Sequence, residues 1–265
     1  MKQWQIFTLI TLVMLFFSIS FSLRGFLSSS AIAQANSQII VSAAASLTDA
    51  LKELAPLYQQ SRSSRVRYNF ASSGALQQQI ENGAPVDVFI SAADRQMDAL
   101  HQKNLLVAAS RRNLLSNRLV LIIPNNRSGI TNLKSLADVR VKRIAIGDPR
   151  SVPAGQYAQE ALTKVGLWNQ LKSKYVLASN VRQVLQFVEA GNADAGLVYL
   201  TDAKASGKVK IAQMIPANLH SGIIYPIAVL KNSRNQTTSR NFVRFLFSQT
   251  AQKVFEKYGF TTVTN

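Results

Sequence analysis

Small and hydroxyl-bearing residues occupy four places in the sequence where a strand is expected to turn into a helix. These places hold Ser46 in "VSAAASL", Ser72 and Ser73 in "FASSGAL", Ala154 in "SVPAG" and Val181 in "SNVRQ". The first turn of a helix carries backbone N–H groups without a partner inside the helix, and also the positive end of the helix dipole. Small residues let a ligand approach these groups, and a serine hydroxyl adds another donor. Such turns could together bind an anion without a countercharge.

Each of these residues also has an ordinary structural interpretation. Ser46 stands three residues before Asp49, the spacing of a capping box, and an N-cap serine stabilises its helix by about 1 kcal/mol. Pro153 and Gly155 are common near the start of a helix. Tyr199 lies late in an apolar strand, where a core position is the default. Taken alone, these residues predict an anion or solute binder only in outline.

Short apolar runs alternate with amphipathic stretches from residue 38 onward. We expect strands over residues 38–44, 66–71, 86–92, 117–124, 143–149, 174–179, 193–203 and 222–230. We expect helices over residues 46–60, 72–83, 93–105, 152–166, 180–191 and 239–260, the last with a break near residues 248–249. Strands that alternate with helices favour parallel βα units and an α/β fold.

Two apolar extended segments, Arg118–Ile123 and Ile223–Leu230, join two sets of these units. A chain that crosses out and back in this way predicts a two-lobed clamshell with two hinge-crossing strands. We assign residues 36–117 and 228–265 to lobe 1 and residues 118–227 to lobe 2. In open α/β sheets, ligands bind at the carboxyl ends of the strands, which is where the four turns lie.

The first 35 residues have the pattern of a secretory signal peptide. Lys2 precedes an uncharged run over residues 6–23, and two overlapping A-x-A sites follow it. We expect cleavage after Ala33 or Ala35 and export to a bacterial periplasm. The run is long enough that retention as a membrane anchor is the alternative. The absence of a cysteine after the run excludes a lipid-anchored form.

The composition excludes several classes of chemistry. The chain has no cysteine and only two histidines, so disulfides, thiolate nucleophiles and side-chain metal sites are not expected. The net charge is +17, but the basic residues are scattered and are not interleaved with aromatic residues. We therefore expect a solvated basic surface, with anionic small molecules rather than nucleic acid as partners.

Six segments together resemble the periplasmic molybdate-binding proteins of ABC importers. In chain order they are "AAASLTDALKEL", "FASSGALQQQIENGAPVDVFISA", "IAIGDPRSVPAGQYAQEAL", "NVRQVLQFVEAGNADAGLVY", "YPIAVL" and "YGF". The resemblance runs from about Ile39 to Phe260. It implies the type II solute-binding fold, and a monomer that captures molybdate, and tungstate with it, and delivers the oxyanion to the importer's membrane permease. It implies no catalytic residue and no cofactor.

The same resemblance implies five ligand-binding residues. Ser46 and Ser73 would donate from the first lobe with their hydroxyls and backbone N–H groups. From the second lobe, Ala154 and Val181 would donate backbone N–H groups and Tyr199 its phenol. The molybdenum would be held only as its oxyanion, through these residues. Gly74 departs from the family pattern, because a hydroxyl residue can stand at that position in relatives.

Three alternatives remain open from the sequence. One is a carrier of sulfate or another tetrahedral oxyanion. Another is an enzyme on the same two-lobed fold, although neither His101 nor His220 lies in a catalytic motif. The last is the sensor domain of a regulator, which export argues against. The sequence does not separate molybdate from tungstate, which share charge and shape.

Overall fold

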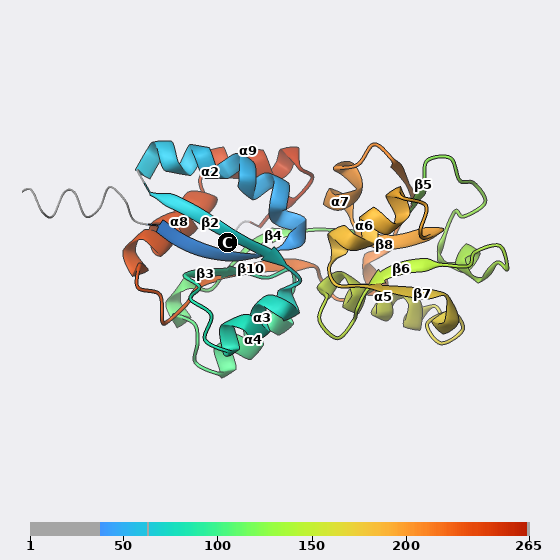
Figure 1. Ribbon diagram of the computed structural model, residues 1–265, viewed down its shortest axis with the longest axis horizontal. Coiled ribbons are helices and arrows are strands. Elements are labelled where there is room, and N and C mark those ends of the chain that lie inside the picture. The colour runs from blue at the N-terminus through green and yellow to red at the C-terminus, as the bar shows by residue number, and fades with distance from the viewer. Residues whose placement is uncertain (1–37, 63, 264–265) are drawn as a thin grey trace, which may run out of the picture.

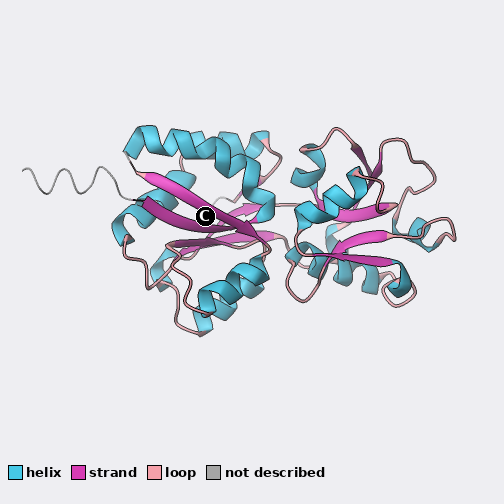
Figure 2. Ribbon diagram, viewed as in Figure 1, coloured by secondary structure: helices cyan, strands magenta, loops and turns pink. Residues whose placement is uncertain are grey.

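The computed structural model describes residues 38–62 and 64–263. The predicted signal peptide lies outside the described residues. The described chain folds into two lobes that lie side by side, each with its own sheet flanked by helices (Figures 1 and 2). This arrangement confirms the predicted two-lobed α/β fold. No helix within residues 38–62 and 64–263 has the length and apolar character needed to cross a membrane.

The first lobe is built on a six-stranded sheet in the order β11-β4-β10-β3-β1-β2. Its strands are β1 (Gln38–Ala44), β2 (Arg65–Ala71), β3 (Val88–Ile90), β4 (Arg112–Ser116), β10 (Ile224–Val229) and β11 (Thr261–Thr262). Its α-helices are α2 (Thr48–Arg62), α3 (Ser73–Glu81), α4 (Asp94–Gln102), α8 (Gln236–Leu246) and α9 (Gln249–Lys257). Helices α2 and α9 cover one face of the sheet, and α3 and α4 cover the other (Figure 1). The predicted break near residues 248–249 is confirmed, because Ser248 caps the new helix α9.

The second lobe is built on a five-stranded sheet in the order β7-β6-β8-β5-β9. Its strands are β5 (Leu119–Pro124), β6 (Ile144–Gly147), β7 (Tyr175–Ala178), β8 (Ala195–Tyr199) and β9 (Val209–Met214). Its α-helices are α5 (Pro153–Lys164), α6 (Val181–Glu189) and α7 (Leu200–Lys204). In both lobes the strands that precede the crevice-facing helices run parallel: β1 pairs with β2 and β3, and β6 pairs with β7 and β8.

Helix α2 illustrates how the hydrophobic pattern fixes packing. Leu51, Leu54 and Tyr58 recur at helical spacing and are fully buried against the first sheet. Pro56 falls inside the helix, which nonetheless continues to Arg62. The rings of Tyr58 and Phe242 pack edge to face with their centroids 5.1 Å apart, so α2 also packs against α8.

The two crossings between the lobes run side by side. One lies between β4 and β5, at Asn117 and Arg118, and the other between β9 and β10. The backbone N–H of Asn117 donates to the Ile223 carbonyl at 3.1 Å, which joins the two crossings. Strand β10 belongs wholly to the first sheet, because Ile227 pairs with both Ile90 and Arg112. The predicted boundary at residues 227/228 therefore falls inside a first-lobe strand, while the division into folding units stays a prediction.

The sequence-based secondary structure was wrong in several places. Residues 200–203 were expected to extend a strand, but they form α7, which begins directly after Tyr199. Strands β4 and β9 were not expected. Only two of the five residues of β4 are buried, and β9 has one buried residue at the edge of its sheet, so neither shows the apolar run of a central strand.

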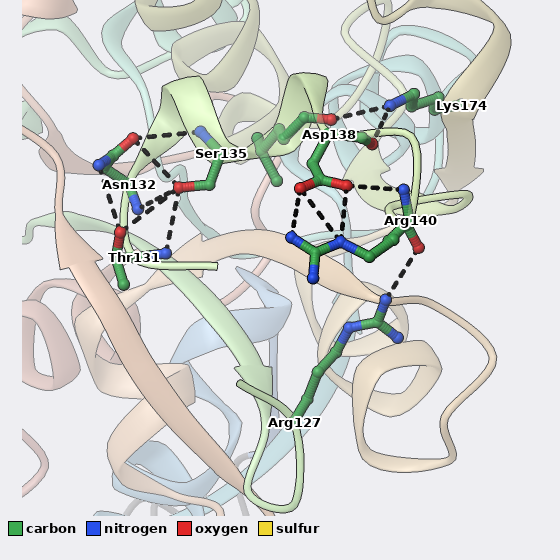
Figure 3. Close-up of polar contacts among 8 residues, drawn as sticks. Arg127, Thr131, Asn132, Ser135, Asp138, Arg140 and Lys174 are labelled. Atoms are coloured by element: carbon green, nitrogen blue, oxygen red, sulfur yellow. Dashed lines mark hydrogen bonds and ion pairs between the residues drawn. The ribbon is translucent and has the colours of Figure 1, made fainter. Parts of the chain in front are cut away.

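Polar side chains hold the long connection between β5 and β6 at the outer end of the second lobe (Figure 3). Arg127 donates to the Arg140 carbonyl at 3.1 Å and pairs with Asp194 at 2.5 Å. Asp138 accepts from Arg140, and Lys174 donates to the Asp138 carbonyl at 2.8 Å. These basic residues therefore stabilise a loop, and they contribute nothing to the crevice between the lobes.

Candidate anion-binding site

A small crevice lies where the two lobes meet. Every residue that lines it is uncharged: Ala44, Ala45, Ser46, Ala71, Ser72, Ser73, Ala92, Val152, Pro153, Ala154, Asn180, Val181 and Tyr199. Larger hollows lie elsewhere, one beside Asp87 and one beside Arg127. The crevice between the lobes differs from these hollows because the first turns of α3, α5 and α6 converge on it.

The structure brings all five predicted ligand-binding residues to this one crevice. Ser73 and Val181 are the first residues of α3 and α6, and Ala154 is the second residue of α5. Their N–H groups lie in first turns and have no acceptor within their own helices. Tyr199 ends β8, and Ser46 follows β1. That these residues hold a ligand remains a prediction.

The capping-box interpretation of Ser46 and Asp49 is wrong. Ser46 lies inside a short 3₁₀ turn, Ala45–Leu47, and α2 begins after it at Thr48. Its hydroxyl lies 2.9 Å from the hydroxyl of Tyr225, and Asp49 forms an ion pair with Arg182 at 2.6 Å. The buried Ser46 side chain is thus not needed to cap α2.

The hydroxyl of Ser73 is oriented by a bond from the backbone. The N–H of Ala92 donates to Ser73 Oγ at 2.9 Å, and both groups are buried. A backbone N–H can only donate, so Ser73 Oγ must accept here. The proton of the serine hydroxyl is then left to point elsewhere, and Ser73 lines the crevice. Ser73 therefore presents a donor to whatever occupies the crevice.

Tyr199 supplies a donor that the described protein does not use. Its side chain is 1% exposed, and its hydroxyl has no hydrogen-bond partner among the described residues. Burial, together with the neighbouring Tyr225 and Tyr157, raises its pKa well above the ordinary value, so the phenol keeps its proton. A buried donor without a partner costs about 1–3 kcal/mol, and an acceptor in the crevice would remove that cost.

The two lobes touch around the crevice, so the structure is in a closed form. The Gly74 N–H donates to the Ser151 carbonyl at 2.9 Å, across the gap between the lobes. A Cβ at Gly74 would lie 2.5 Å from that same oxygen. The departure from the family pattern at Gly74 has a steric reason here, because the closed form leaves no room for a side chain.

Arg182 forms a second link between the lobes. It pairs with Asp49 of the first lobe at 2.6 Å and with Asp202 of the second at 2.7 Å. Asp202 is fully buried, and this burial raises its pKa to about 6, against the opposing effect of Arg182. Two carboxylates thus pair with the Arg182 guanidinium. Arg182 therefore adds no unpaired positive charge beside the crevice.

Sequence reasoning missed the residues that support this site. Asn117 donates to Tyr225, the Tyr225 hydroxyl bonds to Ser46, and Arg182 pairs with Asp49 across the lobes. Tyr225 stands in "YPIAVL", a segment that carried the family resemblance, but its sequence position gives no sign that it contacts Ser46. The two residues are 179 positions apart.

A two-lobed α/β molecule that closes over a crevice of hydrogen-bond donors has the architecture of a solute-binding protein. The chain belongs to the family described as bacterial extracellular solute-binding protein, whose model matches residues 39–261. The predicted membership of this class is thereby confirmed.

Named relatives support a narrower likeness. The molybdate-binding protein ModA of Haemophilus influenzae is 40% identical over 232 residues, or 86% of this chain and 91% of its own. ModA of Escherichia coli is 40% identical over 231 residues, which cover 84% and 89%. Among solved structures, the periplasmic molybdate-binding protein of Azotobacter vinelandii aligns with a TM-score of 0.77 at 26% identity, covering 85% of this chain and all of that one.

Proposed function

We propose that this protein captures molybdate outside the cytoplasmic membrane and delivers it to an ABC importer. The observation that carries the proposal is that the crevice offers hydrogen-bond donors and no charged side chain. A fully deprotonated tetrahedral oxyanion offers only acceptors, so each donor would find a partner. The relatives named as molybdate-binding proteins support this choice of oxyanion.

The five crevice residues would divide the work between the lobes. Ser46 and Ser73 would bind the oxyanion from the first lobe. Ala154, Val181 and Tyr199 would bind it from the second lobe, so that ligand and closure stabilise each other. Helix N-termini supply the electrostatic attraction here, and they do so without a countercharge that would have to be desolvated.

The proposal includes a binder that acts as a monomer and carries out no catalysis. It also includes an exported location, with residues 1–35 serving as the signal peptide, and docking to a membrane permease. Tungstate has the same charge and shape as molybdate, and we propose that it binds the same crevice.

Thermal melting of the purified protein tests this function. Ligand at about a thousand times its Kd stabilises a protein by about 4 kcal/mol, or roughly 10 °C for a chain of this size. We expect molybdate and tungstate to raise the Tm by this amount, and sulfate to raise it less. An unchanged Tm with millimolar molybdate would contradict the proposal. An equal or larger shift with sulfate would instead support a sulfate carrier.

A further inference from the structure

A chain of hydrogen bonds leads from the partly buried hinge residue Asn117 to the crevice. The side-chain amide of Asn117 lies 3.2 Å from the hydroxyl of Tyr225, which lies 2.9 Å from Ser46 Oγ. Tyr225 is fully buried on β10, and Asn117 stands at the crossing between β4 and β5. The geometry alone allows either hydroxyl to be the donor in the bond between Tyr225 and Ser46.

The hinge backbone settles the direction of this chain. The N–H of Arg118 donates at 2.8 Å to the side-chain oxygen of Asn117. A backbone N–H has no other role, so the atom it meets must be Oδ1 and the opposite atom must be the NH₂ group. That NH₂ group donates to Thr201 Oγ1 at 3.0 Å and to the Tyr225 oxygen at 3.2 Å.

The remaining bond follows by elimination. The Tyr225 oxygen accepts from Asn117, so its own proton needs an acceptor. By bond geometry, Ser46 is the other group that meets this hydroxyl within the described chain, since the nearby Tyr199 hydroxyl forms no hydrogen bond there. If Ser46 donated instead, the Tyr225 proton would be buried without a partner, at a cost of about 1–3 kcal/mol. Tyr225 therefore donates to Ser46 Oγ, and the proton of Ser46 is free to point into the crevice.

We infer that Tyr225 and Asn117 are positioning residues that fix Ser46 as a hydrogen-bond donor toward the oxyanion. This inference rests on the proposed function, since it concerns how the same crevice recognises its ligand. The relay explains why Ser46, like Ser73, presents a proton rather than a lone pair. Asn117 stands at the hinge and also donates to Thr201 of the second lobe. The direction of the hydrogen bond at Ser46 therefore depends on a hinge residue that contacts both lobes.

A double-mutant cycle tests the relay. Tyr225→Phe keeps the buried ring and its contacts with Tyr199 and Phe260, and it removes only the hydroxyl. We expect this change to weaken molybdate binding at least fivefold in the wild-type background. Because the relay acts through Ser46, we expect less than a twofold effect of the same change in a Ser46→Ala background.

Ser73→Ala provides the matched control background, because Ser73 receives its bond from Ala92 and lies outside the relay. There Tyr225→Phe should keep its full effect. Melting of the ligand-free variants shows that each is folded. If Tyr225→Phe costs the same in the Ser46→Ala background as in the wild type, the relay is wrong while the proposed function stands. If the wild-type protein fails to bind molybdate at all, both are overturned.

Discussion

At the scale of single residues, hydroxyl groups that line the crevice are left free to act as hydrogen-bond donors. Ser73 accepts from the Ala92 backbone, and the Tyr199 phenol is buried without a partner among the described residues. Each can therefore donate a hydrogen bond to an oxyanion. A ligand that carries its own proton would place two donors face to face, which costs about 1–3 kcal/mol.

Removal of a single donor should weaken binding. We expect Ser46→Ala, Ser73→Ala and Tyr199→Phe each to cost about 1.5–3 kcal/mol of binding free energy, the value of a hydrogen bond to a charged group. Isothermal titration with molybdate measures this. Ser248→Ala is the control: it removes the cap of α9, should cost about 1 kcal/mol of stability, and should leave the affinity unchanged. Wild-type affinity in all three site variants would place the ligand elsewhere.

The family resemblance named five candidate positions, which the structure brings to one crevice, but their hydrogen-bond directions could not be predicted from sequence. Ser46 and Ser73 stand at strand–helix turns whose residue types are visible locally. The donor to Ser46 comes from a residue 179 positions away, and the bond to Ser73 comes from a loop 19 positions away. Such contacts follow from the sheet order, which a single sequence does not display.

At the scale of elements, closure depends on how closely the backbone of α3 approaches the loop before α5. Gly74 allows this contact, and a Cβ there would meet the Ser151 carbonyl at 2.5 Å. Gly155 has a similar role inside the second lobe, because a Cβ there would lie 2.0 Å from the carbonyl of Gly147 on β6. One glycine serves closure and the other serves the packing of a single lobe.

The two glycines should therefore respond differently to alanine. We expect Gly74→Ala to weaken molybdate binding at least tenfold, because the closed form is blocked. Its ligand-free stability should be unchanged or higher by up to about 1 kcal/mol, since alanine favours the helix. Gly155→Ala should instead lower the Tm of the ligand-free protein. Titration and melting of both variants check this, and tight binding by Gly74→Ala would show that closure does not need the contact.

The link between α6 and α7 should give an unusual pH dependence. Burial raises the pKa of Asp202 to about 6, above its ordinary value of 3.8. Between these values the unfolded chain has already released the proton that the folded chain retains, so stability falls as pH rises from about 4 to 6. The contribution is on the order of 2–3 kcal/mol.

Urea unfolding of the wild type and of Asp202→Asn, each at pH 4 and at pH 7, measures this contribution. The difference in unfolding free energy between the two proteins should change between the two pH values. The control is Asp194→Asn. Burial opposes ionisation of Asp194, but bonds from the backbone of Arg143 and Lys142 and the nearby Arg127 lower its pKa overall. Its stabilising contribution is lost mainly below pH 4 and should therefore stay nearly constant between pH 4 and pH 7. A difference for Asp202→Asn that does not change with pH would contradict the assignment.

Element types could be predicted where the hydrophobic period was strong. The buried residues of β1 and the helical face of α2 follow their patterns closely. Helix α7 could not be distinguished from an extension of β8, because its first four residues are all buried, as are the five residues of the strand before it. Tertiary packing rather than local propensity decides such a segment.

At the scale of the whole molecule, the two lobes close over the crevice between them. The lobes meet through Arg182 with Asp49 and through the contact at Gly74. Most of the basic charge lies away from the crevice, as in the loop network around Arg127 and Arg140. In the proposed function, recognition would depend on oriented dipoles and hydroxyls, while the net charge of +17 would attract anions over longer distances.

The most direct test of this account is an isothermal titration of the ligand-free protein with molybdate near neutral pH, with and without a large excess of phosphate. Near that pH phosphate carries at least one proton, and no carboxylate of the described residues lines the crevice to accept it. The account predicts one molybdate bound per chain with the same Kd in both titrations. No binding of molybdate, or competition by phosphate with a Kd within tenfold of that for molybdate, would contradict it.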